Sequence, residues 1–446
     1  MTDLINIGIS GVSAYRSALA TVGDNVVNAE TPGYARRSTV LKETVASAGV
    51  NPLYTATLGG SGVSATAIAR AWDDFKASES RVAIADAAAA DARMRWLATT
   101  ETALGSGQAA DRITAFFTAA DTMAGNPGGT LPRNATLSAL GDAAGALRTT
   151  ADALGRAAAG LTDEAQTTTD ALNANLKALA TINLALRRAD GKGSAHAGLA
   201  DERDRLIDTI SGQIAVAVSL DTSGAATLTL AGSSTTLLAN VTPSQIALKQ
   251  GSDGRLALAV ALPTGEVEPA SPIGGALAGL VDAAATVADR RAQLDSIAQD
   301  FAATVNGWQA NGIDANGQPG APLLAIAGGA STVMLATDDA AKIAAASTDG
   351  VANGNLIALQ PLRDGGTEQR MAALVAVHSQ SVASANAQAT ATATRRDGAL
   401  ASRDETAGID LDREAADLLR FQQAYQASAR IIQTARETLQ SILDIF

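Results

Sequence analysis

Cysteine is absent from this 446-residue chain, and aromatic residues make up only 3% of it. Without a thiol the chain forms no disulfide, binds no zinc through thiolates and has no cysteine nucleophile. With so few rings, its cores must be built from alanine, leucine, valine and isoleucine, which suits helices that approach one another closely. The composition therefore favours long helical bundles.

Basic charge and long apolar runs are also scarce. A net charge of −12 argues against a nucleic-acid backbone or an anionic membrane surface as partner. No apolar run approaches the roughly 20 residues needed to cross a bilayer. Residues 1–14 lack the basic and apolar segments of a cleaved secretory signal. We therefore expect no nucleic-acid partner, no membrane insertion and, if the protein leaves the cell, export without a cleaved signal peptide.

The 11 prolines are widely spaced, and the intervals between them carry apolar residues that repeat every seven positions. Residues 137–186 carry two interleaved rows of leucine and alanine, which predict a helix about 75 Å long. Two more long helices are predicted by further rows. These rows are Phe75, Val82, Ala89 and Trp96, and then Leu280, Val287, Leu294, Phe301 and Trp308 with Leu277, Ala284, Ala298 and Val305 alongside.

Two stretches between these helices alternate with a period of two, which is typical of strands. Residues 213–230 alternate around a turn at 221–224, and residues 244–262 alternate around a turn at 252–254, so each predicts a β-hairpin. Residues 40–70 predict another extended hairpin. Residues 311–360 predict a loop with short elements.

Both ends of the chain carry the same seven-residue apolar repeat, which is the pattern of a coiled-coil seam. The N-terminal rows are Ile5, Val12, Leu19 and Val26, then Gly8, Tyr15, Val22 and Ala29. The C-terminal rows are Leu411, Leu418, Tyr425, Ile432, Leu439 and Phe446, then Phe421, Ser428, Ala435 and Ile442.

A helix with one apolar stripe is marginal in isolation, because ordering its backbone offsets what burial of the stripe contributes. Pairing the two terminal helices still leaves Phe421 and Tyr425 with exposed edges. We therefore expect the paired terminal helices of other copies to cover these edges. We also expect both ends of the chain to be mobile in the free subunit and to become helical when subunits pack. The alternative is that the two helices complete one intramolecular core.

These patterns predict a mainly α fold with a smaller β part, in the form of an elongated multi-domain rod. Residues 1–34 and 409–446 are expected to form a terminal coiled-coil assembly domain. Residues 35–213 and 273–408 are expected to form a long helical bundle with a β-hairpin, and residues 214–272 a small β domain.

Two segments near the chain ends carry a specific motif. Residues 24–36 read Asp-Asn-Val-Val-Asn-Ala-Glu-Thr-Pro-Gly-Tyr-Ala-Arg, and residues 418–426 read Leu-Leu-Arg-Phe-Gln-Gln-Ala-Tyr-Gln. Together with residues 6–14, these segments resemble the flagellar axial proteins, the family of rod, hook and junction subunits, and within it the hook–filament junction subunits. The positions that carry the resemblance are Asn25, Asn28, Thr31, Pro32, Gly33, Tyr34, Arg420, Gln422 and Gln423.

The resemblance implies a structural subunit of the bacterial flagellum that assembles with itself in a ring or helical layer and connects hook to filament. It implies an extracellular position, reached through the flagellar type III apparatus without cleavage. It also implies three partners: the hook protein, a second hook-associated junction protein and a flagellar export chaperone. An outer β domain found in many members is expected to be reduced or missing here.

The motif also has a direct physical interpretation. Thr31-Pro32-Gly33 predicts the end of the first helix, because proline disfavours helical geometry at Thr31 and glycine accepts the turn that follows. Arg36, Arg420, Gln422 and Gln423 are candidate polar contacts between packed subunits; the alternative for each is a solvated helix face.

Signals for catalysis or for a cofactor are weak. His196 and His378 lie far apart and lack partner ligands. The charged run at 201–205 is explained by acidic residues near a helix N-terminus. A loose glycine fingerprint at 60–65 precedes a strand rather than a helix, and residues 314–317 miss the spacing of a calcium loop. We expect no catalytic, cofactor-binding or metal-binding residue. Two alternative functions remain. The chain is either another axial protein (a hook, rod or second junction subunit) or, in a different class, a cell-wall hydrolase on a helical stalk.

Overall fold

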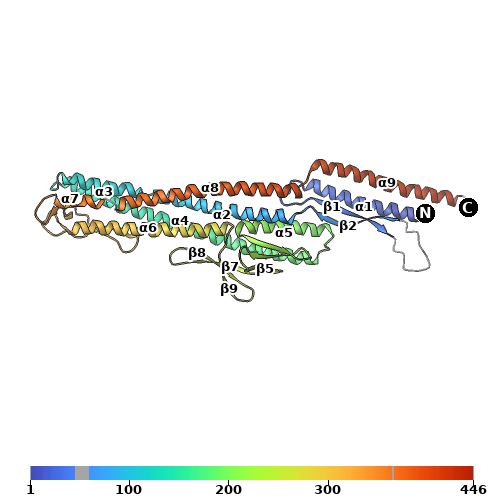
Figure 1. Cartoon of the computed structure of the whole chain (residues 1–446), viewed down its shortest axis with the longest axis horizontal. Helices are drawn as coiled ribbons and strands as arrows, with labels where there is room; N and C mark the ends of the chain where they lie inside the picture. Colours follow the sequence, from blue (N-terminus) through green and yellow to red (C-terminus); the bar gives the residue numbers. More distant parts are fainter. Residues whose placement is uncertain (1, 46–59, 364–365, 445–446) are drawn as a thin grey trace.

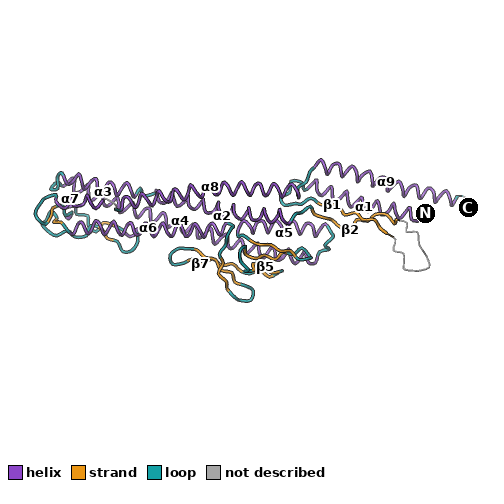
Figure 2. Tube along the Cα trace, in the orientation of Figure 1, coloured by secondary structure: helices purple, strands orange, loops and turns teal. Residues whose placement is uncertain are grey.

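The computed structural model describes residues 2–45, 60–363 and 366–444. The chain is elongated, with long helices running along its length and both chain ends at the same end of the molecule (Figure 1). The expected fold class, mainly α with a smaller β part, is confirmed. The helices are α1 (Thr2–Val27), α2 (Asp74–Gly105), α3 (Ala109–Ala124), α4 (Thr130–Arg188), α5 (Ser194–Gln213), α6 (Ala276–Ala310), α7 (Gly354–Leu359), α8 (Thr367–Ala407) and α9 (Leu411–Leu443). Figure 2 shows the longer strands on the flank of the rod and in a ribbon near the termini, with short strands at the end of the rod near α7.

The long helix expected over residues 137–186 is confirmed as α4, which has 59 residues and is therefore about 90 Å long. Its leucine row is buried from Leu140 to Leu179 and serves two cores. Towards the end of the rod away from the termini, Leu147 packs in a cluster with Phe116 and Phe301. Nearer the termini, Leu172 and Leu179 belong to a second cluster that includes the inner faces of the β-sheets.

The rows predicted for α6 are confirmed, because all nine of their residues are buried. The long helix predicted by the row from Phe75 to Trp96 is confirmed as α2, but the row is not buried along its whole length, since Phe75 is 77% exposed and Val82 is 53% exposed. The helices α5, α6 and α8 pack around a different part of α2, whose buried positions are mainly alanines such as Ala83 and Ala87. Small side chains let these helices approach closely, so Phe75 and Val82 point outward, whereas Trp96 farther along the row packs against the second core.

Both hairpins predicted on the flank of the rod are confirmed. Strand β3 (Val216–Leu220) pairs with β4 (Ala226–Leu230), and β7 (Gln245–Gln250) pairs with β8 (Leu256–Ala261). The short strands β5 (Thr236–Ala239), β6 (Thr242–Pro243) and β9 (Val267–Ala270) extend these pairs into a four-stranded and a three-stranded antiparallel sheet. The region therefore contains two sheets, which pack on α4 and α6 through residues such as Leu228 and Leu258.

The extended hairpin near the N-terminus is confirmed as an antiparallel ribbon of β1 (Arg37–Val45) and β2 (Gly60–Arg70); the turn between them lies outside the described residues. The ribbon runs beside α1 (Figure 1). Residues 311–360 form short elements, as expected. These are β10 (Gly312–Ile313), β11 (Leu324–Ala325), β12 (Met334–Leu335) and β13 (Ala346–Ser347), with 3-10 turns at Ala330–Thr332, Ala340–Lys342 and Gln360–Arg363.

Candidate assembly site

The two terminal helices lie side by side and run antiparallel, so that Gly11 faces Ser428 and Asn25 faces Glu414 (Figure 1). Their closest approach is at two glycines of α1. A Cβ atom at Gly8 would lie 2.5 Å from Cγ1 of Ile432, and one at Gly11 would lie 2.5 Å from Oγ of Ser428. The rings of Tyr15 and Phe421 pack farther along, with centroids 6.4 Å apart. The glycines are therefore what lets the helices approach so closely.

Substitution of Gly11 is expected to separate the pair. Gly11→Val should destabilise the α1–α9 contact by about 1–3 kcal/mol, because the new side chain overlaps Ser428. The matched control is Gly23→Val, since a Cβ atom there meets nothing within 4 Å. Hydrogen exchange of the α9 amides measures the effect, and equal exchange in the two variants would contradict it.

The predicted seam residues differ in how far the chain itself covers them. Val22, Ser428 and Ala435 are buried between the helices, whereas α9 keeps exposed apolar side chains on both sides of the contact line. The half-buried seam residues are Ile5, Val12, Tyr15, Leu19, Leu418, Phe421 and Ile432. The exposed seam residues are Val26, Leu411, Tyr425, Leu439 and Ile442. Phe446 lies outside the described residues.

The two helices are not covered equally. Beside its contact with α9, α1 packs against the β1–β2 ribbon, where Val63 N donates to Ser10 Oγ over 3.2 Å and the Thr21 and Thr39 hydroxyls lie 2.8 Å apart. Helix α9 packs chiefly on α1. Leu419 and Ile431, which the seam prediction omits, are also exposed on α9. The outer surface of α9 is therefore the larger uncovered apolar face of this pair.

A buried polar node joins the base of α9 to the chain that leaves α1. Asn25 and Glu414 are both fully buried, and Asn25 Nδ2 donates to Glu414 Oε2 over 2.8 Å. The same Nδ2 donates to Arg37 O, while Asn25 Oδ1 accepts from Arg37 N and from the Tyr34 hydroxyl. Arg36 Nε completes the node by donating to Glu414 Oε1 over 2.6 Å. One asparagine and one carboxylate thus fix α1, β1 and α9 to one another.

The family motif places Tyr34 and Gly33 at this node. Gly33 has a positive φ of 76°, as its place after Thr31-Pro32 predicts, and it packs against the stem of Arg205. Partial burial raises the pKa of Tyr34, so its hydroxyl stays protonated and donates. Asn28 makes local contacts at the end of α1 instead. Its Nδ2 donates to Asp24 O, and its Oδ1 accepts from Thr31 Oγ1 over 3.3 Å.

The other polar residues of the motif lie on the outside of α9. Gln422 and Gln423 are exposed, and the Arg420 side chain is 68% exposed while it pairs with Asp417 over 3.0 Å. Arg36 was expected to be a contact between subunits, but it is occupied within the chain by Glu414 and Asp417. The reason is that Arg36 follows the turn and points back under the first turn of α9.

Glu414 is the residue of this node that sequence reasoning missed. It lies seven residues before Phe421, in the row that continues through Ser428 and Ala435. A carboxylate in an otherwise apolar row is costly to bury unless it is paired. That exception to the pattern is the signal that could have identified it.

A second polar cluster anchors the ribbon and α2 to α5. The expectation that the charged run at 201–205 lies near a helix N-terminus is wrong, because α5 begins at Ser194 and Asp201 lies two turns inside it. Arg37 and Arg70, at the rod end of the ribbon, each bind Asp201 over 2.7 Å. Arg70 also binds Asp204 over 2.9 Å. The acidic residues of α5 therefore serve as partners for arginines.

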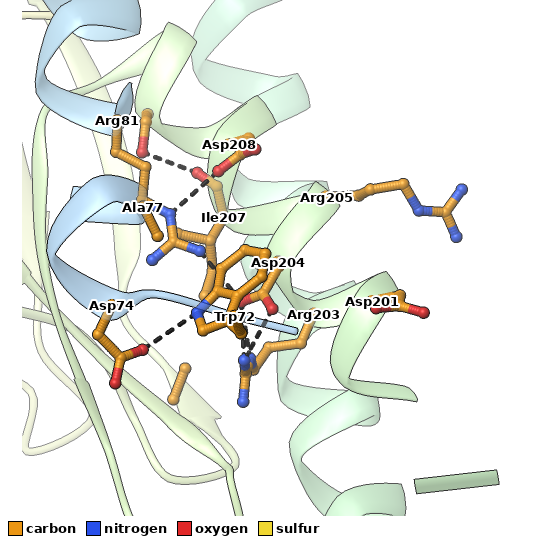
Figure 3. Close-up of polar contacts among 12 residues, drawn as sticks. Trp72, Asp74, Ala77, Arg81, Asp201, Arg203, Asp204, Arg205, Ile207 and Asp208 are labelled. Carbon is orange, nitrogen blue, oxygen red and sulfur yellow. Dashed lines mark hydrogen bonds and ion pairs between the residues drawn. The ribbon is translucent and has the colours of Figure 1, made fainter. Parts of the chain in front are cut away.

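The same cluster continues to α2 and α8. Arg81 of α2 binds Asp204 and Asp208, each over 3.0 Å, and Figure 3 shows these side chains meeting between the two helices. Arg403 near the end of α8 binds Asp208 over 2.6 Å. The Arg70 guanidinium lies 4.7 Å from the centroid of the Trp72 ring. Each of these arginines is at least four-fifths buried, so the cluster fixes the ribbon to the rod just below the terminal pair.

The histidines have structural surroundings. His196 Nε2 lies 3.0 Å from Ser223 O, at the turn of the β3–β4 hairpin. His378 is fully buried between α2, α6 and α8. Arg290 Nε donates to His378 Nδ1 over 3.3 Å, which assigns the ring proton to Nε2, and Nε2 then donates to Leu97 O over 2.9 Å. The site therefore requires the neutral ring.

The buried His378 is expected to make the rod less stable in acid. Burial lowers the pKa of His378, and the nearby charge of Arg290 lowers it further. The stability of the folded rod is then complete above the unfolded-state pKa of about 6.5 and falls as the pH drops through that value. Urea unfolding between pH 8 and pH 5 measures this loss. His378→Gln should flatten the profile, and a profile in this variant as steep as that of the native chain would contradict the prediction.

The weak signals for other chemistry have ordinary structural explanations. Asp314 Oδ1 accepts hydrogen bonds from the backbone N–H groups of Asn316 and Gln318, which makes a turn. The glycine-rich segment at 60–65 lies on strand β2. Within residues 2–45, 60–363 and 366–444, no His, Asp and Glu side chains gather as a metal site would need. In the same ranges, no helix has the length and apolar character of a membrane span.

The fold and this site define an elongated, mainly helical subunit whose paired chain ends carry uncovered apolar faces. The family model described as "Flagellar hook-associated protein FlgK helical domain" matches residues 97–324, half of the chain. A second model, "Flagellar basal body rod FlgEFG protein C-terminal", matches residues 397–445. The chain belongs to the FlgK family of flagellar hook-associated proteins.

Individual relatives agree with this assignment. Flagellar hook-associated protein 1 of Escherichia coli is 24% identical over 78% of this chain and 64% of the relative. The protein of the same name from Bacillus subtilis is 23% identical over 97% of this chain and 96% of the relative. The protein of the same name from Salmonella typhimurium is 26% identical over 73% of this chain and 60% of the relative. The chain therefore spans less than two thirds of the length of these two enterobacterial relatives.

A solved structure supports the fold. The flagellar hook junction protein FlgK from Burkholderia pseudomallei superposes with a TM-score of 0.51 at 23% identity, over 56% of this chain and 47% of that chain.

Proposed function

We propose that this chain is a structural subunit of the bacterial flagellum that assembles with copies of itself through α1 and α9 and connects hook to filament. The observation that carries the proposal is the outer surface of α9, where Leu411, Tyr425 and Leu439 are exposed. The family motif lies on the same helix. Apolar side chains repeated along a helix favour a second helix as their cover. Membership of a family of structural flagellar proteins supports the same function.

We assign residues 1–34 and 409–446 to the assembly domain, residues 35–213 and 273–408 to the bundle and residues 214–272 to the β domain. Within the assembly domain the apolar seam residues supply the contact area. Arg420, Gln422 and Gln423 are exposed on the outer side of α9, where a neighbouring copy would contact them. Asn25 and Tyr34 act inside the subunit by holding the base of α9.

A position between hook and filament also implies which proteins the subunit contacts. The hook protein lies on one side, a second hook-associated junction protein lies on the other, and an export chaperone covers α9 before assembly. The subunit is extracellular and leaves the cell through the type III apparatus without cleavage. The match of the rod-protein model to residues 397–445 supports the view that α9 packs as other axial proteins do.

Removal of α9 tests the function, with hooks and filaments scored by electron microscopy. The same experiment separates this chain from a hook or rod subunit, because loss of either of those removes the hook itself. A hydrolase on a helical stalk would instead require a catalytic pair, and we assign none.

A further inference from the structure

Asparagine is followed directly by glycine at four places in this chain. The four pairs are Asn306-Gly307, Asn311-Gly312, Asn316-Gly317 and Asn353-Gly354. Asparagine is chemically labile, and a following glycine favours its loss, because a residue without a Cβ atom lets its backbone nitrogen approach the side-chain amide carbon. Attack by that nitrogen closes a succinimide ring, which is the first step of deamidation. The local sequence treats the four pairs alike, so the fold decides between them.

Two of the four asparagines are held by their own hydrogen bonds. Asn306 lies inside α6, where its Nδ2 donates to Leu324 O over 2.8 Å and its Oδ1 accepts from the N–H groups of Leu323 and Leu324, each over 3.0 Å. Asn353 Nδ2 donates to Ala124 O over 3.0 Å. Ring closure at either position requires these bonds to break, and at Asn306 it also requires α6 to open.

At the third pair the asparagine is exposed, but the nitrogen that would attack it is not. Gly312 is buried and pairs with Ser347 of β13, whereas the Asn311 before it is exposed. A Cβ atom at Gly312 would overlap the Asn355 side chain and Ala344 O. The packing around Gly312 therefore leaves its backbone no room to turn toward the Asn311 side chain while the fold is intact.

The fourth pair, Asn316-Gly317, is the one that the fold leaves open. Both residues are exposed in the turn between β10 and Pro319, and a Cβ atom at Gly317 would meet nothing within 4 Å. The Asn316 side chain forms no hydrogen bond with the part of the chain that the structure describes. The attacking nitrogen has one restraint, because Gly317 N donates to Asp314 O over 3.1 Å. A single bond in an exposed turn opens far more readily than a helix does.

We propose that Asn316 is a modification site, at which the side-chain amide is lost by spontaneous deamidation. Hydroxide removes the proton from Gly317 N, and this nitrogen attacks Cγ of Asn316. The bond between Cγ and Nδ2 then breaks, and Nδ2 leaves as ammonia after it takes a proton from water. Water opens the succinimide at either carbonyl, which gives isoaspartate or aspartate. The reaction consumes one water, releases one ammonia and leaves a carboxyl group that is ionised at neutral pH.

The product changes the turn in which it forms. Isoaspartate adds a methylene group to the main chain, which moves Gly317 N away from Asp314 O. The new carboxylate also lies beside that of Asp314, whose Oδ1 accepts from the N–H groups of Asn316 and Gln318. Like charges repel at this range, so we expect the modified turn to open. The turn follows α6 at the end of the rod away from the termini (Figure 1), so negative charge accumulates there.

Peptide mass spectrometry of the purified full chain tests the inference, which does not depend on the proposed function. The folded protein is incubated at pH 8 and sampled over time, and fragment ions assign each conversion to its asparagine. We expect Asn316 to convert at least about tenfold faster than Asn306, Asn311 or Asn353, because only its pair reacts without opening of packed structure. Isoaspartate at position 316 is the diagnostic product, since direct hydrolysis of the amide gives aspartate alone.

The matched control is the same chain unfolded in guanidinium chloride. There the four pairs lose the protection that the fold gives, so their rates should agree to within about threefold. Asn316→Gln, which would have to form a larger ring, should remove the fast conversion from the folded protein and leave the three slow ones as they are. The inference is overturned if Asn316 in the folded chain converts no faster than the other three asparagines, or if unfolding leaves its advantage unchanged.

Discussion

Cells that produce the chain without residues 409–446 are expected to build hooks and to shed flagellin instead of holding filaments. The deletion removes α9 and with it the cover of Tyr15 and Val22 on α1. It also leaves Asn25 and Arg36 without the Glu414 carboxylate that both contact. On the proposed function, the layer that joins hook to filament then fails to form. Electron microscopy of cells and flagellin in the medium measure the outcome.

Point variants on the outer face of α9 distinguish a packing defect from loss of the whole helix. Tyr425→Asp and Leu439→Asp change side chains that the subunit itself leaves exposed, so the isolated subunit should keep its stability to within about 0.5 kcal/mol. Assembly should nevertheless fail, because each change places a charge in the contact between subunits. Thr434→Asp, at an exposed polar position of α9 that we do not assign to the contact, is the control for an added charge.

Export has to be measured beside assembly, because α9 is also the segment that we assign to the chaperone. Each variant should still be found in the medium when it is secreted but not retained. Normal filaments on cells that produce the deletion, or on cells that produce Tyr425→Asp together with Leu439→Asp, would show that α9 does not hold neighbouring subunits together.

The second large effect is expected at Glu414. Glu414→Ala removes a fully buried carboxylate and leaves Arg36 and Asn25 with buried donors that lack acceptors. Breaking a buried charged pair in this way destabilises the local structure by about 3–5 kcal/mol. Because the node lies at the base of α9, the loss should appear as faster hydrogen exchange in the first turns of α9 and at the end of α1.

Arg420→Ala is the matched control, because its ion pair with Asp417 lies on an exposed part of the same helix. Exposed pairs contribute about 0–1 kcal/mol, so this variant should exchange almost as the native chain does. If Glu414→Ala exchanged no faster than Arg420→Ala, the node would not hold the terminal pair. In dilute native protein the same measurement reports whether the far ends of α1 and α9 are mobile before assembly, which stays a prediction.

Much of the fold follows from local pattern. The rows of α4 and α6 predict their helices because a seven-residue apolar repeat has one packing solution when proline is absent. The β3–β4 and β7–β8 hairpins follow from alternation around Gly224 and Gly254, both of which take a positive φ at the turn. The short strands β5, β6 and β9 could not be predicted, since two to four residues carry too little periodicity to distinguish a strand from a loop.

The outward position of Phe75 and Val82 could not be predicted either, because burial on α2 depends on where α6 begins. A heptad row reports that one face of a helix is apolar, but it does not say whether another part of the chain reaches that face. The α5 aspartates show the same limitation. Their arginine partners come from β1, β2, α2 and α8, which only the folded chain brings together.

The sequence by itself determined that this protein is a rod of long helices with paired terminal helices and a flagellar motif, because periodicity, proline spacing and motif residues are local properties. The tertiary structure alone decided which face of α9 stays open and that Glu414 and Asn25 form the base of the terminal pair. Those features depend on distances between residues far apart in the chain. Helix crossing, close approach at glycine and the burial of charges set such distances, and no periodicity in a single segment records them.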